Sequence, residues 1–589
     1  MNSSFSERNL PRMSTGRLTM IDIEQAVNNK FPNFSQQPDL IRKPTLSFIK
    51  KLTHSDEINE FLEEHGELQG FEFIDKVFDY FNFSYSVGSR DRNNIPSQGR
   101  VVIIANHPIG SLDGLAILRL VGEVRRDVKI VANDMLMNFD PLHPLFIALD
   151  NMTGTGTRKS YRAIMEALER EEAVIIFPSG EVSRARPTGV KDTRWRSGFL
   201  HFARKAKAPL LPVFIGAKNS LLFYSASMLF KPLGTALLAR EMFNKQSAQI
   251  QFRVGEAIPA SALNNEKLGD RGIIKRLRKH LYKIGKRRQP IFVTEKTIAH
   301  PEDRQELVQE LNQARLLGET RDQNRILLAD YENGTALIKE IGRLREVAFR
   351  KVGEGTGGKR DLDKYDKSYR HLVLWDNKQL EIAGAYRIGE AGKIMAEQGV
   401  EGLYTSSLYE FRKDFTPYLE QGLELGRSFV NPDYWGKASL DYLWQGIGAY
   451  LRHHPNIRYL IGPVSMSARY PRTLMDQLVH YYQHFYAAKE NWATANQPYK
   501  LSLESQQTLA AEYEGLSKDD AMKLLQERFI EAGYKMPVLF KQYTALFEGD
   551  GFQLLTFSVD PDFGDCLDGL FIADLSKLKA AKRKRYLGN

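Results

Sequence analysis

A histidine and an aspartate lie six positions apart in the stretch Asn106-His107-Pro108-Ile109-Gly110-Ser111-Leu112-Asp113-Gly114. If the Asp113 carboxylate accepts the proton of one imidazole nitrogen, the other nitrogen becomes a competent base for an acceptor hydroxyl. This chemistry requires no metal, and the sequence contains no His/Cys cluster at ligand spacing. We predict that His107 is a general base held by Asp113. A capping histidine beside a charge at a helix start would show the same pattern.

Short apolar runs alternate with helical patterns around this pair. The residues Val101 to Ala105 directly precede it and are mostly β-branched, which predicts a buried strand. Helical spacing is found at 115–121 and 161–168, and the further predicted strands are 128–132, 173–177, 210–215 and 249–254. This alternation predicts an α/β domain with a mainly parallel sheet. Ligands of such sheets bind at the carboxyl ends of the strands, where His107 lies.

A second polar turn follows the strand predicted at 173–177. It contains Gly180 and Glu181, with Arg184 three positions later. Gly180 permits close approach of the backbone, and Glu181 or Arg184 could bind a polar acceptor headgroup. Arg158 could hold a phosphate of the acceptor or of a carrier. A turn with a solvated acid and a structural arginine at a helix start are the alternatives.

These blocks resemble the glycerolipid acyltransferases. In that family four residues usually separate the histidine from the aspartate, whereas five do so here, as in the haemolysin-like branch. Phe177 to Glu181 resembles the third family block, while 154–158 and 209–213 resemble the second and fourth more loosely. The resemblance implies an O-acyltransferase domain over residues 41–297. In such a domain His107 takes the proton of a hydroxyl that attacks a thioester carbonyl.

Bulk properties limit the class of protein. A chain of 589 residues is too long for one core, so at least two domains are expected. The single cysteine, Cys566, excludes an internal disulfide framework and fits a reducing compartment. Residues 1–40 lack a continuous apolar stretch and predict a flexible leader rather than a secretory signal. The sequence contains no apolar run of about 20 residues, so no membrane-spanning helix is predicted.

The positive charge is concentrated in two runs. The net charge is +10, and residues 275–288 and 577–585 contain eight and six Lys or Arg without an acid. Neither run accompanies a nucleic-acid-binding signature, so we expect no nucleic acid partner. With the amphipathic segment 219–239, the runs predict peripheral attachment to an anionic membrane, on the cytoplasmic face of a bacterial inner membrane. Two solvated faces are the alternative.

The second half of the chain begins with a charged segment. Residues 298–330 carry leucines at helical intervals and predict a helical linker, followed by a domain over 331–589. That domain has a predicted helix at 337–350 and predicted strands at 371–374, 382–388 and 423–430. Its notable polar residues are Arg345, Asp363, Asp366, Arg387, Glu424 and Arg427.

These residues and their order resemble the acyl-homoserine-lactone synthases and the ornithine N-acyltransferases, which share the GNAT fold. The resemblance implies that Glu424 deprotonates an α-amine and that Arg345, Asp363, Asp366, Arg387 and Arg427 bind substrate. Glu424 and Arg427 would lie on opposite faces of a regular strand, so a local bend is needed to bring them together. Ordinary charge pairing is the alternative.

The donor is expected to bind at Gly436, Lys437 and Ala438. GNAT proteins hold the diphosphate of coenzyme A at this place, but Asp433 stands here where they carry Gln or Arg. This departure weakens the case for coenzyme A and is compatible with an acyl carrier protein, which has one phosphodiester for Lys437, so acyl carrier protein is the expected donor and acyl-coenzyme A remains the alternative. The basic runs would suit an acidic carrier protein. No permanently bound cofactor is expected.

The order of the two halves resembles the bifunctional ornithine-lipid synthases. This implies N-acylation of ornithine with a 3-hydroxyacyl group by the second half, then O-acylation of the 3-hydroxyl of the lyso-aminolipid by the first. Glycine, lysine and glutamine remain open as head groups. A lysophospholipid acyltransferase and a non-enzymatic, haemolysin-like membrane-perturbing protein are the alternative functions.

Overall fold

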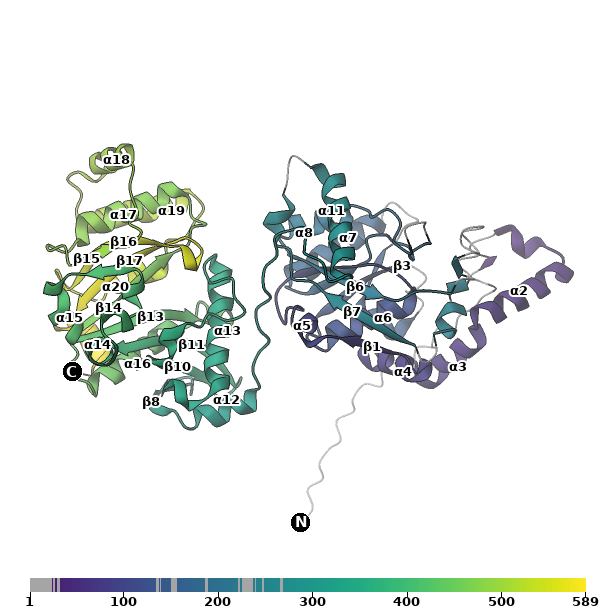
Figure 1. The fold of residues 1–589 in the computed structure, drawn as a ribbon, viewed down its shortest axis with the longest axis horizontal. Helices are drawn as coiled ribbons and strands as arrows, with labels where there is room; N and C mark the ends of the chain where they lie inside the picture. The colour runs from purple at the N-terminus through teal and green to yellow at the C-terminus, as the bar shows by residue number, and fades with distance from the viewer. Residues whose placement is uncertain are drawn as a thin grey trace, which may run out of the picture. The chain divides into compact units, whose positions relative to one another are not determined.

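The computed structural model describes residues 24, 27–28, 32–133, 137, 139–149, 156–185, 189–220, 223–224, 237–238, 240–245, 248–264 and 268–588. It forms two compact units, Met1–Thr297 and Ile298–Asn589, each built around a large sheet (Figure 1). The predicted α/β fold class is confirmed. Most of the expected leader and most of the segment 219–239 lie outside the described residues.

The sheet of the first unit is almost entirely parallel, as expected. Only its β6–β7 pair is antiparallel. Its strands, in spatial order, are β1 (Ser84–Val87), β7 (Gln249–Val254), β6 (Leu210–Gly216), β2 (Val101–Ala105), β5 (Ala173–Ile176), β3 (Val128–Asn133) and β4 (Phe146–Leu149).

Strand β2 is fully buried because helices cover both faces of the sheet. Val101, Ile103 and Ala105 pack with α4 (Phe71–Phe81) and α6 (Ser111–Gly122). Val102 and Ile104 pack on the other face with α7 (Gly156–Glu169), α8 (Gly198–Lys205) and α11 (Gly269–Ile284). This two-sided burial explains why the strand is a continuous apolar run rather than an alternating one.

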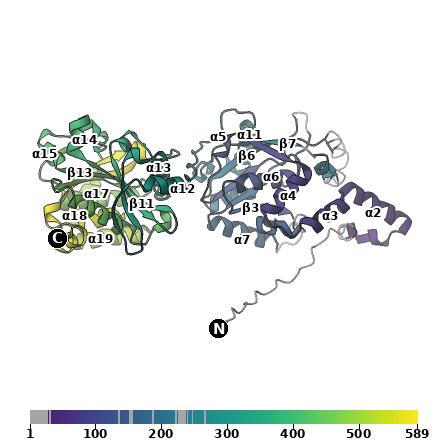
Figure 2. The same ribbon diagram turned by 90° about the horizontal axis from the view of Figure 1, so that it is seen from below.

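An arm of two helices projects from the first unit. Helix α2 (Asp39–Thr53) and helix α3 (Ser55–His65) extend away from the sheet in both ribbon views (Figures 1 and 2). Three large apolar side chains of α2 face solvent, with Leu40 89%, Ile41 54% and Phe48 65% exposed. An exposed apolar face of this kind marks an interaction surface.

The sheet of the second unit has eight strands. Its order is β16 (Phe552–Asp560), β17 (Cys566–Asp574), β14 (Tyr459–Met466), β13 (Gly422–Val430), β11 (Glu381–Glu390), β10 (Arg370–Asp376), β9 (Arg325–Ala329) and β8 (Arg315–Glu319). Helix α13 (Thr335–Val352) packs on one face and α16 (Ser439–Arg452) on the other. The other helices of this unit that enter below are α14 (Ala391–Gln398), α20 (Val538–Thr544) and α21 (Ala580–Tyr586).

The segment 298–330 is not the helical linker that its leucine spacing predicted. Helix α12 covers only Arg304–Leu311, and residues 315–319 and 325–329 form β8 and β9. Strand β9 pairs with β10 and is buried from Ile326 onward. Pairing with a neighbouring strand and burial of its side chains therefore outweigh the local helical pattern.

The strands β13 and β14 separate soon after they pair. They form the parallel pair of this sheet and are in register only over Gly422–Glu424 and Tyr459–Ile461. At the next position a Cβ on Gly462 would lie 2.1 Å from the carbonyl oxygen of Leu425, so only glycine fits there. Beyond this point the strands diverge, and their side chains line a cavity.

Candidate active sites

His107 and Asp113 are hydrogen-bonded at the carboxyl end of β2. The imidazole Nδ1 lies 2.8 Å from Oδ1 of Asp113. The other carboxylate oxygen accepts the backbone N–H groups of Ile109 at 2.9 Å and Gly110 at 3.3 Å, which fixes Asp113 at the start of α6. Because Nδ1 donates to Asp113, Nε2 carries the lone pair that can accept a proton. The structure thus brings together the two residues of the predicted base.

The environment of His107 strengthens its basicity. Burial by itself would lower the pKa of His107, but the nearby carboxylates of Asp113 and Asp192 outweigh burial and raise that pKa above its usual value. The Phe177 ring stacks on the imidazole, with the ring centroids 4.1 Å apart. The His107 side chain remains 19% exposed, whereas Asp113 is fully buried. The imidazole is therefore held rigidly with one side open to solvent.

Asp192 supports this site and was missed in the sequence. Its Oδ1 accepts the backbone N–H of His107 at 3.2 Å and the Ser183 hydroxyl at 2.6 Å. Its Oδ2 accepts the Trp195 indole N–H at 2.8 Å. The Ser183 N–H in turn donates to the His107 carbonyl at 2.7 Å. No local pattern reveals Asp192, because its partner His107 is 85 positions away in the chain.

The turn after β5 places Arg184 beside this network. Gly180 has φ +65°, a left-handed conformation that favours glycine. One terminal nitrogen of Arg184 lies 3.8 Å from Glu181. Its Nε and Nη1 are buried, with no hydrogen-bond partner in the described part of the chain. Arg158 is exposed on α7, and the preceding residues 151–155 lie outside the described residues.

The predicted arginines and aspartates of the second unit come together as ion pairs. Arg345, Arg387, Asp361 and Asp366 are all nearly inaccessible to solvent. The pairs are Arg345–Asp366 at 2.7 Å, Arg387–Asp363 at 2.6 Å and Arg427–Asp361 at 3.1 Å. Although burial opposes it, Arg345 and Arg387 lower the pKa of Asp366 far below its usual value. These carboxylates are thus held by the chain's own guanidinium groups.

The structure contains the local bend that the spacing of Glu424 and Arg427 requires. Arg427 has φ +44°, and the β11–β13 register shifts beside it. As a result, both side chains reach the same segment of the chain. The Thr405 N–H donates to Glu424 at 2.8 Å, and Arg427 donates to the Tyr404 hydroxyl at 2.8 Å.

Glu424 is enclosed. It is 2% exposed, and its second carboxylate oxygen accepts the Tyr369 hydroxyl at 2.5 Å. Burial raises the pKa of Glu424, although these hydrogen bonds oppose the rise. It does not line the cavity between β13 and β14. Its role as the base therefore remains a prediction.

A cavity of about 920 Å³ occupies the separation of β13 and β14. Its walls include Arg427 and Ser428 of β13 and Gly462 to Met466 of β14. The predicted donor residues Gly436, Lys437 and Ala438 also line it, directly before α16. Gly436 has φ +77°, and the Lys437 amine lies 4.5 Å from the centre of the Tyr434 ring. This arrangement suits a long substrate that enters past the start of α16.

Two carboxyl groups of the cavity wall were missed in the sequence. Glu354 accepts the Ser465 hydroxyl at 2.9 Å, and Asp568 of β17 lies directly opposite Ser465 in the sheet. Burial raises the pKa of Glu354 to about 7. Burial, with the charges of Asp560 and Glu354, raises the pKa of Asp568 to about 8. Neither residue belongs to a motif, because only the folded sheet brings them together.

Two other kinds of feature are absent from the residues that the structure describes. They contain no group of three or more His, Cys, Asp or Glu side chains placed to hold a metal ion. No helix among them is long and apolar enough to cross a membrane.

Two family models match the chain. A model described as Acyltransferase covers residues 30–286, which include His107 and Arg184. A second, described as Acetyltransferase (GNAT) domain, covers residues 344–445, which include Glu424 and Gly436 to Ala438.

Curated relatives carry out both kinds of acyl transfer. A glycine N(alpha)-acyltransferase of Bacteroides thetaiotaomicron is 30% identical over 49% of this chain and 89% of its own length. A lyso-glycine lipid O-acyltransferase of the same organism is 29% identical over 43% of this chain and 94% of its own length. An L-ornithine N(alpha)-acyltransferase of Brucella abortus is 29% identical over 37% of this chain and 76% of its own length.

The raised pKa of Asp568 predicts a pH-dependent stability. The folded chain keeps a proton on Asp568 up to about pH 8, whereas the unfolded chain releases it near pH 4. The contribution of this residue to stability is therefore fully present below pH 4 and is lost as the pH rises to 8. We expect the free energy of unfolding of Asp568→Asn, relative to that of the wild type, to be higher at pH 8 than at pH 5. Urea unfolding of the full chain measures both. Exposed Asp562→Asn is the control, and an equal pH dependence of wild type and Asp568→Asn would contradict the assignment.

Proposed function

The chain belongs to the family of the Nα-acyltransferases, with an acyltransferase domain ahead of its GNAT domain, and from this premise we propose that it makes a diacylated amino-acid lipid. It is an acyltransferase for both N-acyl and O-acyl transfer, and the family resemblances inferred from its motifs are confirmed. In the proposal, the second unit acylates the α-amine of an amino acid with a 3-hydroxyacyl group. The first unit then esterifies the new hydroxyl.

The hydrogen-bonded His107 and Asp113 are the observation that carries this proposal. A histidine held in this way serves acyl transfer to a hydroxyl, because a hydroxyl must lose its proton as it attacks. A free amine attacks through its lone pair, so it needs no such base once its ammonium form has lost a proton. An N-acylated glycine or ornithine has no hydroxyl on the amino acid itself. The hydroxyl for the second transfer must therefore come from the acyl chain, which makes a hydroxyacyl donor the fitting substrate of the second unit.

The O-acylation step follows from the geometry of the first unit. Nε2 of His107 takes the proton of the 3-hydroxyl as its oxygen attacks the thioester carbonyl carbon. The C–S bond then breaks, and His107 returns the proton to the leaving thiolate. The lyso-lipid retains an α-carboxylate, and Nε and Nη1 of Arg184, which have no partner among the described residues, form a suitable site for it.

The N-acylation step uses the acidic wall of the cavity. The ammonium group of the amino acid binds beside Glu354 and Asp568 and transfers a proton to Glu354, whose pKa lies near 7. The free amine attacks the thioester carbonyl carbon at the separation of β13 and β14, the C–S bond breaks, and a second proton of the amine passes to the leaving thiolate. Glu424, the base that the sequence predicts, does not line the cavity, so we assign proton transfer to Glu354 and give Glu424 a positioning role, in which it holds Tyr369 and the backbone of Thr405.

An acyl carrier protein is the proposed donor for both steps. Its phosphopantetheine arm carries one phosphodiester, which suits the exposed Lys437 and the N–H groups at the start of α16. The surface of a carrier protein is acidic, and the run 275–288 presents exposed Lys and Arg side chains along α11. The run 577–585 offers less free charge, because Lys577 pairs with Asp550 and Arg585 with Asp441.

Ornithine is the proposed amino acid, and glycine is the second candidate. Asp560 and Glu354 lie close enough to raise the pKa of Asp568 beside Arg427, and this group of carboxyls favours a substrate with two ammonium groups. Glycine is supported by the relative that is matched over 89% of its length. Product analysis with both amino acids separates the two.

The proposed location is the cytoplasmic face of a bacterial inner membrane, with α2 as the contact. Its exposed apolar side chains Leu40, Ile41 and Phe48 lie on one face of the helix. Lys43, Lys50 and Lys51 are exposed on the same helix and would meet anionic headgroups. Both the product and the lyso-lipid intermediate are membrane lipids. An enzyme docked on the membrane therefore keeps the intermediate close to the O-acylation site of the first unit.

The loss of the base should separate the two steps. In a bacterial host that makes no aminolipids, the wild-type chain should yield the diacylated lipid, and His107→Ala should accumulate the mono-acylated lipid instead. Loss of a general base typically costs ~10²- to 10⁴-fold in rate. Lipid mass spectrometry of the extracts measures both species, and His143→Ala, an exposed histidine of the same unit, is the control.

Two outcomes would overturn the proposal. Phosphatidic acid that rises without any aminolipid would identify a lysophospholipid acyltransferase. A membrane-perturbing effect that persists unchanged in His107→Ala, again without aminolipid, would identify a non-enzymatic function.

The proton acceptor of the second unit predicts a pH profile. A carboxyl with a pKa near 7 must be ionised to take the proton, so N-acylation by the wild type should rise with pH between 6 and 8. Glu354→Gln should lower kcat and flatten this rise, as measured by thiol release at saturating amino acid. Exposed Glu397→Gln is the matched control. A wild-type profile retained in Glu354→Gln would exclude Glu354 as the acceptor.

The contact helix predicts vesicle binding. Leu40→Asp with Phe48→Asp should reduce co-sedimentation with phosphatidylglycerol-containing vesicles, because charge replaces the apolar face. Added salt should weaken wild-type binding by screening the lysines of α2. Leu503→Asp changes an equally exposed leucine (77%) of the other unit and should leave binding intact. Equal loss in both variants would argue against α2 as the contact.

A further inference from the structure

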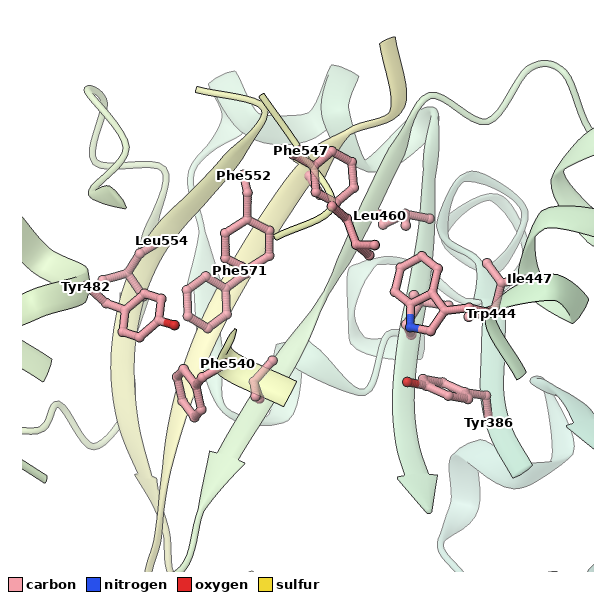
Figure 3. Packing of buried hydrophobic residues seen from close by; sticks show 14 of the residues in the cluster. Tyr386, Trp444, Ile447, Leu460, Tyr482, Phe540, Phe547, Phe552, Leu554 and Phe571 are labelled. Carbon is pink, nitrogen blue, oxygen red and sulfur yellow. The ribbon is translucent and has the colours of Figure 1, made fainter. Parts of the chain in front are cut away.

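One polar group of side chains interrupts an otherwise apolar wall of the cavity in the second unit. Leu460, Phe547, Phe552 and Phe571 line that wall and pack in one aromatic core (Figure 3). The polar residues that line the same cavity include a group next to this wall: Tyr386 of β11, Ser428 of β13, Trp444 of α16 and Tyr543 of α20. We refer to these four residues as the hydroxyl cluster.

The members of the hydroxyl cluster are in contact. The hydroxyls of Tyr386 and Tyr543 are 2.7 Å apart, and the rings of Trp444 and Tyr543 meet edge to face at 5.6 Å. Burial raises the pKa of Tyr386 to about 12, and its contacts with Tyr543, Ser428 and Trp444 partly offset that rise. In Figure 3 the Trp444 indole nitrogen and the Tyr386 hydroxyl oxygen turn to the same side, toward Phe571.

One donor of the hydroxyl cluster is poorly satisfied. Trp444 is 4% exposed, and its buried Nε1 makes no hydrogen bond of good geometry in the described part of the chain, although it lies close enough to the Tyr386 hydroxyl to lower the pKa of that tyrosine. A buried N–H without an acceptor costs free energy, so it marks a place where a ligand can supply one. A plain methylene chain in this cavity would leave the donor unpaired. A hydroxyl oxygen would accept from Trp444 and donate to a tyrosine oxygen.

The bend at Arg427 places the hydroxyl cluster next to the reacting centre. Arg427 faces the acidic side of the sheet with Tyr404, whereas Ser428 contacts Tyr386 on the opposite side. An acyl chain whose thioester carbonyl reacts between β13 and β14 thus places the carbons next to that carbonyl beside Ser428. The hydroxyl of a 3-hydroxyacyl thioester is carried two carbons from the reacting carbonyl, which fits this position better than a hydroxyl far along the chain.

We propose that the hydroxyl cluster binds the 3-hydroxyl of the acyl donor and selects hydroxylated over unsubstituted acyl chains. This inference rests on the proposed N-acylation in the second unit. Such selection also explains how one protein distinguishes between its two acyl donors. Only a hydroxylated chain placed on the amine leaves the first unit a group to esterify.

The test compares two donors on the full chain. N-acylation rates are measured with 3-hydroxyacyl and unsubstituted acyl carrier protein of equal chain length. We expect the wild type to prefer the hydroxylated donor. Trp444→Phe and Tyr543→Phe keep the rings but remove the polar atoms, so each should lower the ratio of the two kcat/KM values by about tenfold or more. The ratio is the readout, because any general effect of either substitution on the cavity changes both rates together.

Tyr482→Phe is the matched control. Tyr482 is fully buried in the same core, but it does not line the cavity. Its removal should leave the ratio unchanged. A ratio that stays unchanged in both Trp444→Phe and Tyr543→Phe would overturn the inference.

Binding separates this inference from the proposed function. The dissociation constants of non-hydrolysable 3-hydroxyacyl and acyl pantetheine analogues are measured by calorimetry on the same variants. A wild-type preference for the hydroxylated analogue that is lost in Trp444→Phe supports the hydroxyl cluster even if no amide forms. Amide formation without any such preference would retain the proposed function and reject the hydroxyl cluster.

Discussion

The short parallel pairing of β13 and β14 is the constraint on which the second unit depends. The two strands are in register over three residues each and then diverge, with Gly462 passing the carbonyl of Leu425 too closely for any side chain. A continuous ladder would fill this space with backbone. Its interruption creates a cavity with two chemically different sides, one acidic and one aromatic. An amine and an acyl chain can therefore approach the same point from opposite faces of one sheet.

Both units keep charge buried by pairing it. In the first unit Asp113 fixes the imidazole, and Asp192 fixes the backbone that carries it. In the second unit the ion pairs of Arg345 and Arg387 stabilise the face on which Arg427 lies. Removal of one partner would leave an uncompensated buried charge, which is strongly destabilising. The groups that remain without full compensation, among them Glu354 and Asp568, face the cavity, where a substrate can supply the missing charge.

Sequence reasoning succeeded where partners are close in the chain or where burial leaves a clear pattern. Strand β2 was predictable because burial on both faces produces a continuous apolar run, and His107 meets Asp113 within one helix start. The bend at Arg427 was expected because the family resemblance brings Glu424 and Arg427 together, whereas strand periodicity places them on opposite faces. Strands β8 and β9 were missed because pairing with β10 decided their structure. Asp192, Glu354 and the hydroxyl cluster were invisible because their partners are brought together only by the sheets.

The order of the two transfers is the central claim, and a time course on the purified full chain tests it most directly. The chain is supplied with isotopically labelled ornithine, a 3-hydroxyacyl carrier protein and a second acyl carrier protein, in the presence of anionic vesicles. We expect labelled mono-acyl amide to appear first, without a lag, and diacyl lipid to follow at its expense. Labelled ester that forms before any amide, or diacyl lipid that appears without passing through the amide, would contradict this order.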